Sequence, residues 1–152
     1  MKHESGRSLI EVIGVMAIAG VMTLAALKMF QVMRTNQKRT IANAELEQIA
    51  ENTKLLLEMR DDYTGVSVDY LIKAGALQSD RAPIGGDGWS VNASADGKSF
   101  SINLVDLTTG ECDYFSNTLP QWANAILVNG FETGYTENCF ESDTNQISFI
   151  VE

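Results

Sequence analysis

The sequence predicts an α+β fold, in which one long N-terminal helix is followed by an antiparallel sheet. Between Ser8 and Arg60 glycine occurs only twice, and no proline precedes Pro83, so a helix of about fifty residues is uninterrupted. Apolar and polar residues then alternate in short runs such as 99–105, which is typical of strands. A long helix followed by several strands is typical of the α+β class.

The first half of the predicted helix is apolar enough to enter a membrane. Residues 9–27 read LIEVIGVMAIAGVMTLAAL and contain one charge, that of Glu11. A segment of this length can cross the apolar core of a bilayer as a helix. We therefore predict a membrane helix over 7–28, preceded by a short polar leader over 1–6.

The second half of the helix, over 29–61, is predicted to be amphipathic. Apolar residues and one threonine recur at helical spacing and are expected to face a folded head over 62–152. These residues are Ala42, Leu46, Ile49, Thr53, Leu56 and Met59. The charged residues between them are expected to point outward, and they are Glu45, Glu47, Glu51 and Lys54.

The head is predicted to contain a connecting segment over 66–88 and then a sheet. A short helix over 68–74 precedes the glycine-rich turn PIGGDG. The later elements follow from alternation and turn residues. They are strands over 89–93 and 99–105 that form a hairpin around a turn at 95–98, a helix over 111–119, and strands over 125–128 and 146–151.

Charge is distributed unevenly along the chain, whose net charge is -9. Residues 1–39 carry about +4 and residues 40–152 about -13. An acidic head repels the phosphate backbone, so we expect no direct binding of nucleic acid.

The two cysteines, Cys112 and Cys139, both follow the membrane segment. They show neither CxxC nor histidine spacing, which argues against zinc. Outside the cytoplasm they would form one disulfide, whose closed loop of about 27 residues would stabilise the head by roughly 3–4 kcal/mol. Two unpaired buried thiols are the alternative.

Catalysis is not expected. The only histidine, His3, lies in the predicted leader, so histidine-dependent triads are excluded from the remainder of the chain. The pair Asp61 and Asp62 reads as a solvated helix end, and PIGGDG lacks the lysine of a phosphate-binding loop. We predict no cofactor and no metal. A calcium site is the alternative, and its candidate ligands are Asp87, Asp96 and Asp143.

Three processing routes are possible for the N-terminus. A secretory signal could be cleaved near Ala17 and Ala19, and an uncleaved anchor would fit the length. Neither accounts for Glu11, whose charge costs at least about 2.5–3.5 kcal/mol near a bilayer centre. A carboxylate that reaches the membrane surface from its own helix is a further alternative.

The third route is a resemblance. Gly6 followed by RSLIEVIGVMAIAG resembles the signal of type IV prepilins. The resemblance implies cleavage after Gly6 by a prepilin peptidase, which makes Arg7 the first residue and Glu11 the fifth. It also implies that the new ammonium group of Arg7 pairs with Glu11 of a neighbouring subunit. Arg7 departs from the family, which usually has phenylalanine, methionine or leucine there, with a methylated amino group.

The head resembles the type IVb major pilins, including those of toxin-coregulated and conjugative thin pili. The resemblance rests on APIGGDGWSVNAS, on CDYF and on the distant second cysteine. It implies an αβ-loop over 66–88 and a disulfide-bounded D-region over 112–139.

The expected function is therefore that of a pilus subunit. The subunit would reside in the inner membrane, with its head in the periplasm although Lys28, Arg34, Lys38 and Arg39 follow the span, against the positive-inside rule. An assembly platform and ATPase would then add it to an extracellular helical filament of identical subunits for adhesion, aggregation or conjugative contact. The alternatives are a minor pilin or type II secretion pseudopilin, and a bitopic periplasmic binding or sensor protein that does not polymerise.

Overall fold

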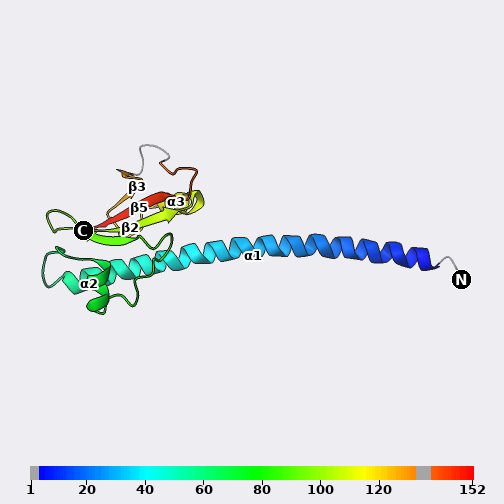
Figure 1. Cartoon of the computed structure of the whole chain (residues 1–152), viewed down its shortest axis with the longest axis horizontal. Coiled ribbons are helices and arrows are strands. Elements are labelled where there is room, and N and C mark those ends of the chain that lie inside the picture. The colour runs from blue at the N-terminus through cyan, green and yellow to red at the C-terminus, as the bar shows by residue number, and fades with distance from the viewer. Residues whose placement is uncertain (1–3, 133–137) are drawn as a thin grey trace. The chain divides into compact units, whose positions relative to one another are not determined.

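A computed structural model describes residues 4–132 and 138–152, and of residues 4–7 it describes only the backbone. It confirms the α+β class (Figure 1). The chain forms two compact units that meet in sequence between Lys38 and Arg39, and each is described by itself. The first three residues of the predicted leader, including His3, lie outside the described residues.

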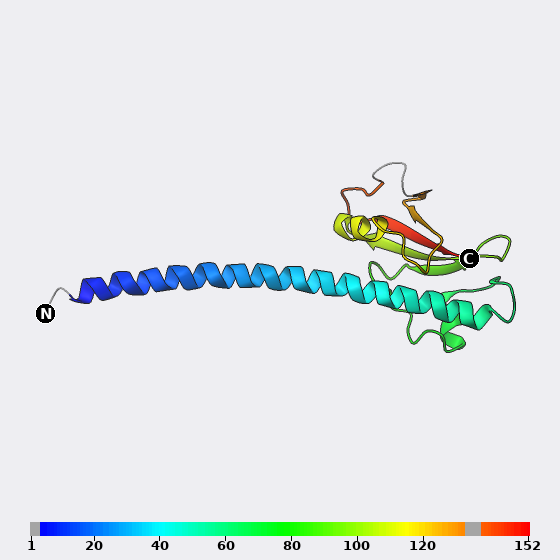
Figure 2. The same cartoon turned by 180° about the vertical axis from the view of Figure 1, so that it is seen from behind.

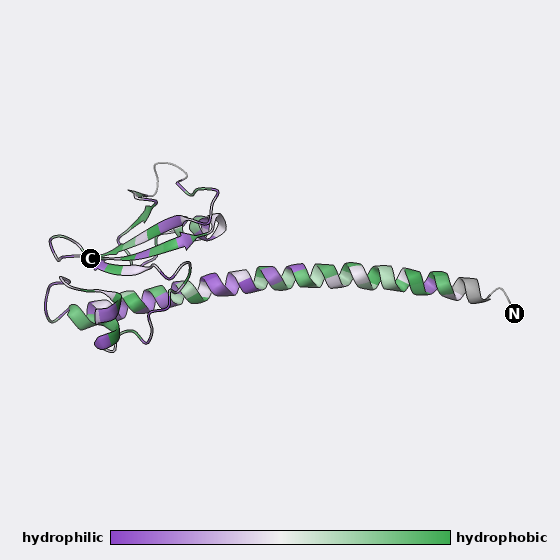
Figure 3. Cartoon of the chain, in the orientation of Figure 1, coloured by the Kyte–Doolittle hydropathy of each residue, from purple (hydrophilic) through white to green (hydrophobic). Residues whose placement is uncertain are grey.

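Helix α1 extends over Glu4–Leu57, as the scarcity of helix breakers predicts. Within the first unit, every side chain from Ser8 to Lys38 is exposed. Figure 3 shows that apolar residues dominate the N-terminal part of this segment. The hydroxyl of Thr23 donates a hydrogen bond to the carbonyl oxygen of Ala19 at 2.7 Å, so this polar group is satisfied within the helix.

The second unit contains an antiparallel sheet of five strands in the order β1-β2-β5-β3-β4 (Figures 1 and 2). The two long strands, β2 and β5, lie next to each other inside the sheet, with Ile102 opposite Phe149. The strands are β1 Ser90–Ala93, β2 Phe100–Leu107, β3 Ala125–Val128, β4 Phe131–Glu132 and β5 Asn145–Val151. The predicted hairpin of β1 and β2 is confirmed.

One face of the sheet and the last turns of α1 share a single apolar core. Alternate residues of β2 and β5 point into it, because successive side chains of a strand face opposite sides. The largest side chains include Phe100, Ile102, Leu104, Ile147 and Phe149, all at most 1% exposed. From α1, the core receives Ala42, Leu46, Ile49, Ala50 and Leu57.

The predicted buried stripe of the helix is confirmed through Leu56, which is partly buried and packs against the core, and is wrong at Met59. Met59 is 97% exposed, whereas Leu57 is 1% exposed. The reason is that α1 ends at Leu57 and not at residue 61. The chain then turns, with Asp61 in a left-handed conformation at φ 53, so helical spacing no longer places Met59.

The two short helices are also found. Helix α2, Val68–Lys73, begins at the N-cap Ser67, whose hydroxyl accepts from the N–H of Tyr70. Helix α3, Thr109–Ser116, begins two residues before its predicted start and ends three residues before its predicted end. The early start has a local cause, because Thr108 and Glu111 form a capping box.

Candidate assembly sites

The first candidate site is the apolar N-terminal segment of α1. By length and composition it is able to cross a membrane, with a mean hydropathy of 2.2 in its most apolar window. Its large apolar side chains between Leu9 and Leu27 are each more than half exposed. An exposed apolar surface of this extent is typical of segments that contact a membrane or another protein.

Glu11 is the single charged residue among these apolar side chains, and it is exposed. Gly14 lies three residues further on, where helical geometry places it on the same face as Glu11. A Cβ atom added at Gly14 would meet nothing within 4 Å. The backbone beside the carboxylate is thus open to a close approach.

The predicted processing residues, Gly6 and Arg7, lie within α1. The Arg7 side chain lies outside the described part of the chain. The next charged residues along the helix are Lys28, Arg34 and Lys38, all exposed. The guanidinium of Arg34 lies 5.6 Å from the centre of the Phe30 ring.

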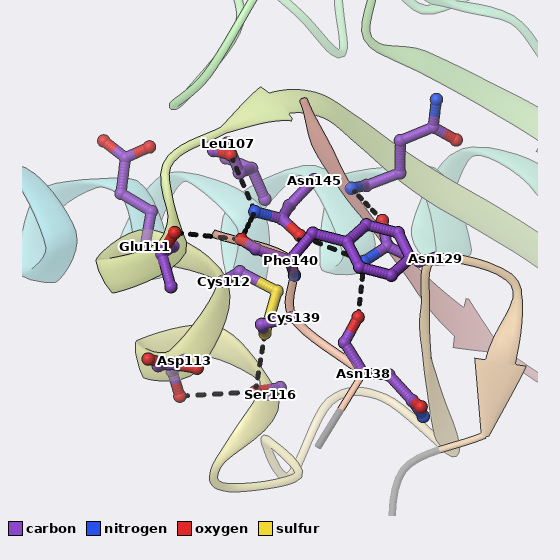
Figure 4. Close-up of a disulfide and its surroundings, with 12 residues drawn as sticks. Leu107, Glu111, Cys112, Asp113, Ser116, Asn129, Asn138, Cys139, Phe140 and Asn145 are labelled. Carbon is purple, nitrogen blue, oxygen red and sulfur yellow. Dashed lines mark hydrogen bonds between the residues drawn. A yellow bond between two sulfur atoms is a disulfide. The ribbon is translucent and has the colours of Figure 1, made fainter. Parts of the chain in front are cut away.

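The second candidate site surrounds the disulfide between Cys112 and Cys139, which confirms the predicted pairing (Figure 4). Their Cα atoms are 5.9 Å apart, and Cys112 is fully buried. The alternative of two unpaired thiols is wrong, because the chain contains no free cysteine. The bond joins α3 to the segment that precedes β5. The hydroxyl of Thr109 strengthens this junction by donating to the carbonyl oxygen of Phe140 at 2.9 Å.

Two asparagines outside the predicted sites hold the segment beyond Cys139 (Figure 4). Asn145 is fully buried, and its amide group donates to the carbonyl oxygens of Leu107, Phe140 and Ser142. Its Oδ1 atom accepts from the N–H of Phe140 at 2.7 Å and from the Asn129 amide at 3.0 Å. Asn129 donates in addition to the carbonyl oxygen of Asn138.

The Asn129–Gly130 pair offered a signal for part of this arrangement. Both residues have positive φ, 49° and 87°, and they connect β3 to β4. Asn-Gly is the preferred pair in tight hairpin turns of this kind. The contact between Asn129 and Asn145 had no such signal, because it joins residues sixteen positions apart.

Acidic and aromatic side chains are exposed around the disulfide. We call this set the disulfide surface, and it consists of Asp113, Phe140, Glu141 and Asp143, all exposed and each within four residues of Cys112 or Cys139 in sequence. The Phe140 side chain is 56% exposed. Exposed aromatic rings beside charges are typical of protein interfaces. Arg39 lies close by, with its guanidinium 5.4 Å from the centre of the Tyr114 ring.

The carboxylates of the calcium alternative are not brought together. Within residues 4–132 and 138–152, no three His, Cys, Asp or Glu side chains lie close enough to hold a metal ion. Asp96 belongs to the turn of the β1–β2 hairpin. The Ser94 hydroxyl and the Lys98 N–H donate to its carboxylate and hold its pKa below the usual value.

Asp62 has a comparable role in the turn after α1. The hydroxyl and the N–H of Thr64 donate to Oδ1 at 2.6 and 2.7 Å, and they lower the pKa of Asp62. A lowered pKa stabilises the fold above the pKa of the unfolded chain, and this contribution is lost as the pH falls through the folded value. Both carboxylates therefore act within turns.

A polar groove of about 370 Å³ lies between α1 and the segment after α2. It is lined in part by Glu45, Asn52 and Arg81, and the Arg81 guanidinium is 4.0 Å from the Glu45 carboxylate. Such an exposed ion pair contributes about 0–1 kcal/mol. The groove offers hydrogen-bonding groups but no paired nucleophile and base.

The comparison with known protein families found no family that matches this chain. No curated protein showed significant similarity to it.

Proposed function

We propose that this chain is the structural subunit of a type IVb-like pilus. It is inserted in the inner membrane, cleaved after Gly6 by a prepilin peptidase, and extracted by an assembly platform and ATPase. The N-terminal helices of identical subunits then pack together in an extracellular filament that serves adhesion, aggregation or conjugative contact. The observation that carries this proposal is Glu11, a lone charge five positions after Gly6 on an exposed apolar helix.

The exposed apolar side chains of α1 support both stages of this life cycle. Lipid covers them before assembly, because the segment has the length and composition of a membrane span. Helices of other subunits cover them in the filament, where the same apolar surface is again removed from water. Neither stage requires the head to unfold.

Glu11 sets the axial position of one N-terminal helix relative to the next in this packing. Its carboxylate is costly in an apolar environment unless a cation neutralises it. The ammonium group created at Arg7 by cleavage is such a cation in an incoming subunit. A slip by one helical turn, about 5.4 Å, would leave both charges unpaired. The open backbone at Gly14 gives the incoming N-terminus room to approach.

The first test is substitution of Glu11 by Gln, which removes the charge and keeps the size. We expect membrane insertion at the wild-type level and loss of surface fibres, measured by immunoblotting of membranes and of sheared fibre fractions. Glu47→Gln is the matched control, because Glu47 is exposed on the same helix within the second unit. Normal fibre yield from Glu11→Gln would contradict the pairing.

Mass spectrometry of sheared surface material separates the candidate functions. An abundant chain that begins at Arg7 supports a major pilin, and trace amounts support a minor pilin or a secretion pseudopilin. A chain that stays in the membrane and retains Met1 would instead indicate a bitopic periplasmic binding or sensor protein, and the proposed function would then be wrong.

A further inference from the structure

The charges of this chain are separated more sharply than its net charge indicates. Between Glu11 and Glu45 the sequence contains no acidic residue and four basic ones. After Lys98 it contains no basic residue, although acidic residues continue to Glu152. One stretch of α1 is therefore purely cationic, and the second half of the head is purely anionic.

The cations of α1 share one side of the helix. At 3.6 residues per turn, Lys28, Arg34 and Lys38 fall within about a third of the helix circumference and extend over about 15 Å. We call these three residues the cationic stripe. All three are exposed, and none forms an ion pair with any residue that the structure describes. Exposed apolar side chains, Met29 and Met33, occupy the other side.

We infer that the cationic stripe docks on the disulfide surface of a second copy of this chain. The inference rests on the proposed function, since it assigns one of the contacts between subunits in the filament. The disulfide surface offers carboxylates of Asp113, Glu141 and Asp143 as partners for three cations. Charge complementarity of this kind fixes the orientation of partners and accelerates their encounter.

The disulfide surface fits the stripe better than the other acidic region of the head. The acidic residues over 45–62 are interspersed with Lys54 and Arg60, which reduce the local potential. The disulfide surface has no basic residue in its own sequence, and Arg39 of α1 lies beside it over the Tyr114 ring. The surface keeps its carboxylates on a fixed frame. That frame is the disulfide together with the hydrogen bond from Thr109 to Phe140.

Arg39 shows within the second unit that α3 accepts a cation from α1. Its guanidinium lies over the Tyr114 ring, and a Cβ atom at Gly110 would come within 2.9 Å of it. Glycine at position 110 thus leaves room for this side chain. Arg39 is only partly exposed, whereas the three preceding cations are exposed, so the stripe available to another copy consists of those three.

Charge reversal tests the inference directly. The first variant carries Arg34→Glu and Lys38→Glu, the second carries Asp113→Lys and Glu141→Lys, and the third combines all four. We expect each of the first two to lower the yield of sheared fibres about tenfold, and the combination to restore it to within about threefold of wild type. The amount of subunit in the membrane should stay constant.

Matched control variants reverse two charges of the same sign outside the cationic stripe or outside the disulfide surface. Lys54→Glu with Lys73→Glu replaces two cations outside the stripe, and Glu47→Lys with Glu51→Lys replaces two acids outside the disulfide surface. We expect fibre yield near the wild-type level from both. A combined variant that stays defective would overturn the inference, as would normal yield from the first variant.

Carbodiimide cross-linking of wild-type fibres provides an independent measurement. The reagent joins a lysine amine to a contacting carboxylate with loss of water. We expect the dimer band to contain peptides that link Lys28 or Lys38 to Asp113, Glu141 or Asp143. Links from these lysines only to acids over 45–62 would overturn the inference.

Two further outcomes are distinguishable. If the stripe serves anionic lipid, the first variant will lose retention in vesicles that contain phosphatidylglycerol but not in neutral vesicles, and the combination will not restore fibres. That result overturns the inference and leaves the proposed function intact. If wild-type cells carry no fibres of this chain, the proposed function itself fails.

Discussion

Asn145 is the residue on which the order of the disulfide surface depends most. Among the contacts shown in Figure 4, its side chain alone forms hydrogen bonds with the end of β2, with the segment after Cys139 and with the β3–β4 turn. Both the amide nitrogen and the amide oxygen of Asn145 form hydrogen bonds, and the side chain is fully buried. A buried polar side chain with all its bonds made specifies one arrangement of the loops around it.

Replacement of Asn145 by Ala should therefore destabilise the head. The N–H of Phe140 and the carbonyl oxygen of Leu107 would lose their partner, and a cost of about 2–6 kcal/mol follows from about 1–3 kcal/mol for each of these two unsatisfied groups. Urea unfolding of the full chain in detergent micelles, followed by the fluorescence of Trp89 and Trp122, measures it. Gln146→Ala is the control, because that side chain is exposed. Equal stability of the two variants would contradict the role of Asn145.

At the scale of elements, the β1–β2 hairpin is tied to the turn after α1. The N–H of Tyr63 donates to the carbonyl oxygen of Gly97 at 2.9 Å, and Gly97 has φ 69°. A Cβ atom there would overlap Oδ1 of Asp62 and approach Oγ1 of Thr64. Glycine is thus required at this position for two separate reasons, its conformation and the space around it.

A comparison of two alanine variants separates these reasons. Gly75→Ala meets nothing within 4 Å and should cost about 1–2 kcal/mol through its left-handed conformation alone. Gly97→Ala carries the same conformational cost and must also displace Asp62, so it should be clearly more destabilising. The midpoint of urea unfolding provides the comparison. If the two variants lost equal stability, the overlap between the methyl group added at position 97 and the Asp62 side chain would have no energetic cost.

The sequence predicted those elements that depend on neighbouring residues. The long helix follows from the scarcity of glycine and proline, and β2 follows from the alternation of Phe100, Ile102 and Leu104. Strand β4 was missed, because two residues carry no alternation. The end of α1 was misplaced, since helical spacing continues through Met59 while the backbone does not.

The features of the candidate sites also differ in whether the sequence could predict them. The apolar segment and the cysteine pairing are properties of residue type and spacing, so they could be predicted. The role of Glu11 stays a prediction. The Asn145 network and the Arg39–Tyr114 contact join residues far apart in sequence. They become visible only when the sheet and α3 are folded, and no local pattern indicates them.

At the scale of the whole molecule, the two units have different sources of stability. The head depends on an apolar core, on its turns and on one disulfide. From Ser8 to Lys38 the helix has only exposed side chains, so the stability of this part depends on its own backbone hydrogen bonds and on the medium around it.

The two units should therefore unfold separately. In detergent micelles, urea should abolish the native fluorescence of Trp89 and Trp122 while about half of the helical signal in circular dichroism remains, because α1 up to Lys38 contains about half of the helical residues. Reduction of the disulfide should lower the stability of the head by about 3–4 kcal/mol and leave the remaining helical signal unchanged. A single transition that removed fluorescence and all helicity together would show instead that the helix depends on the folded head.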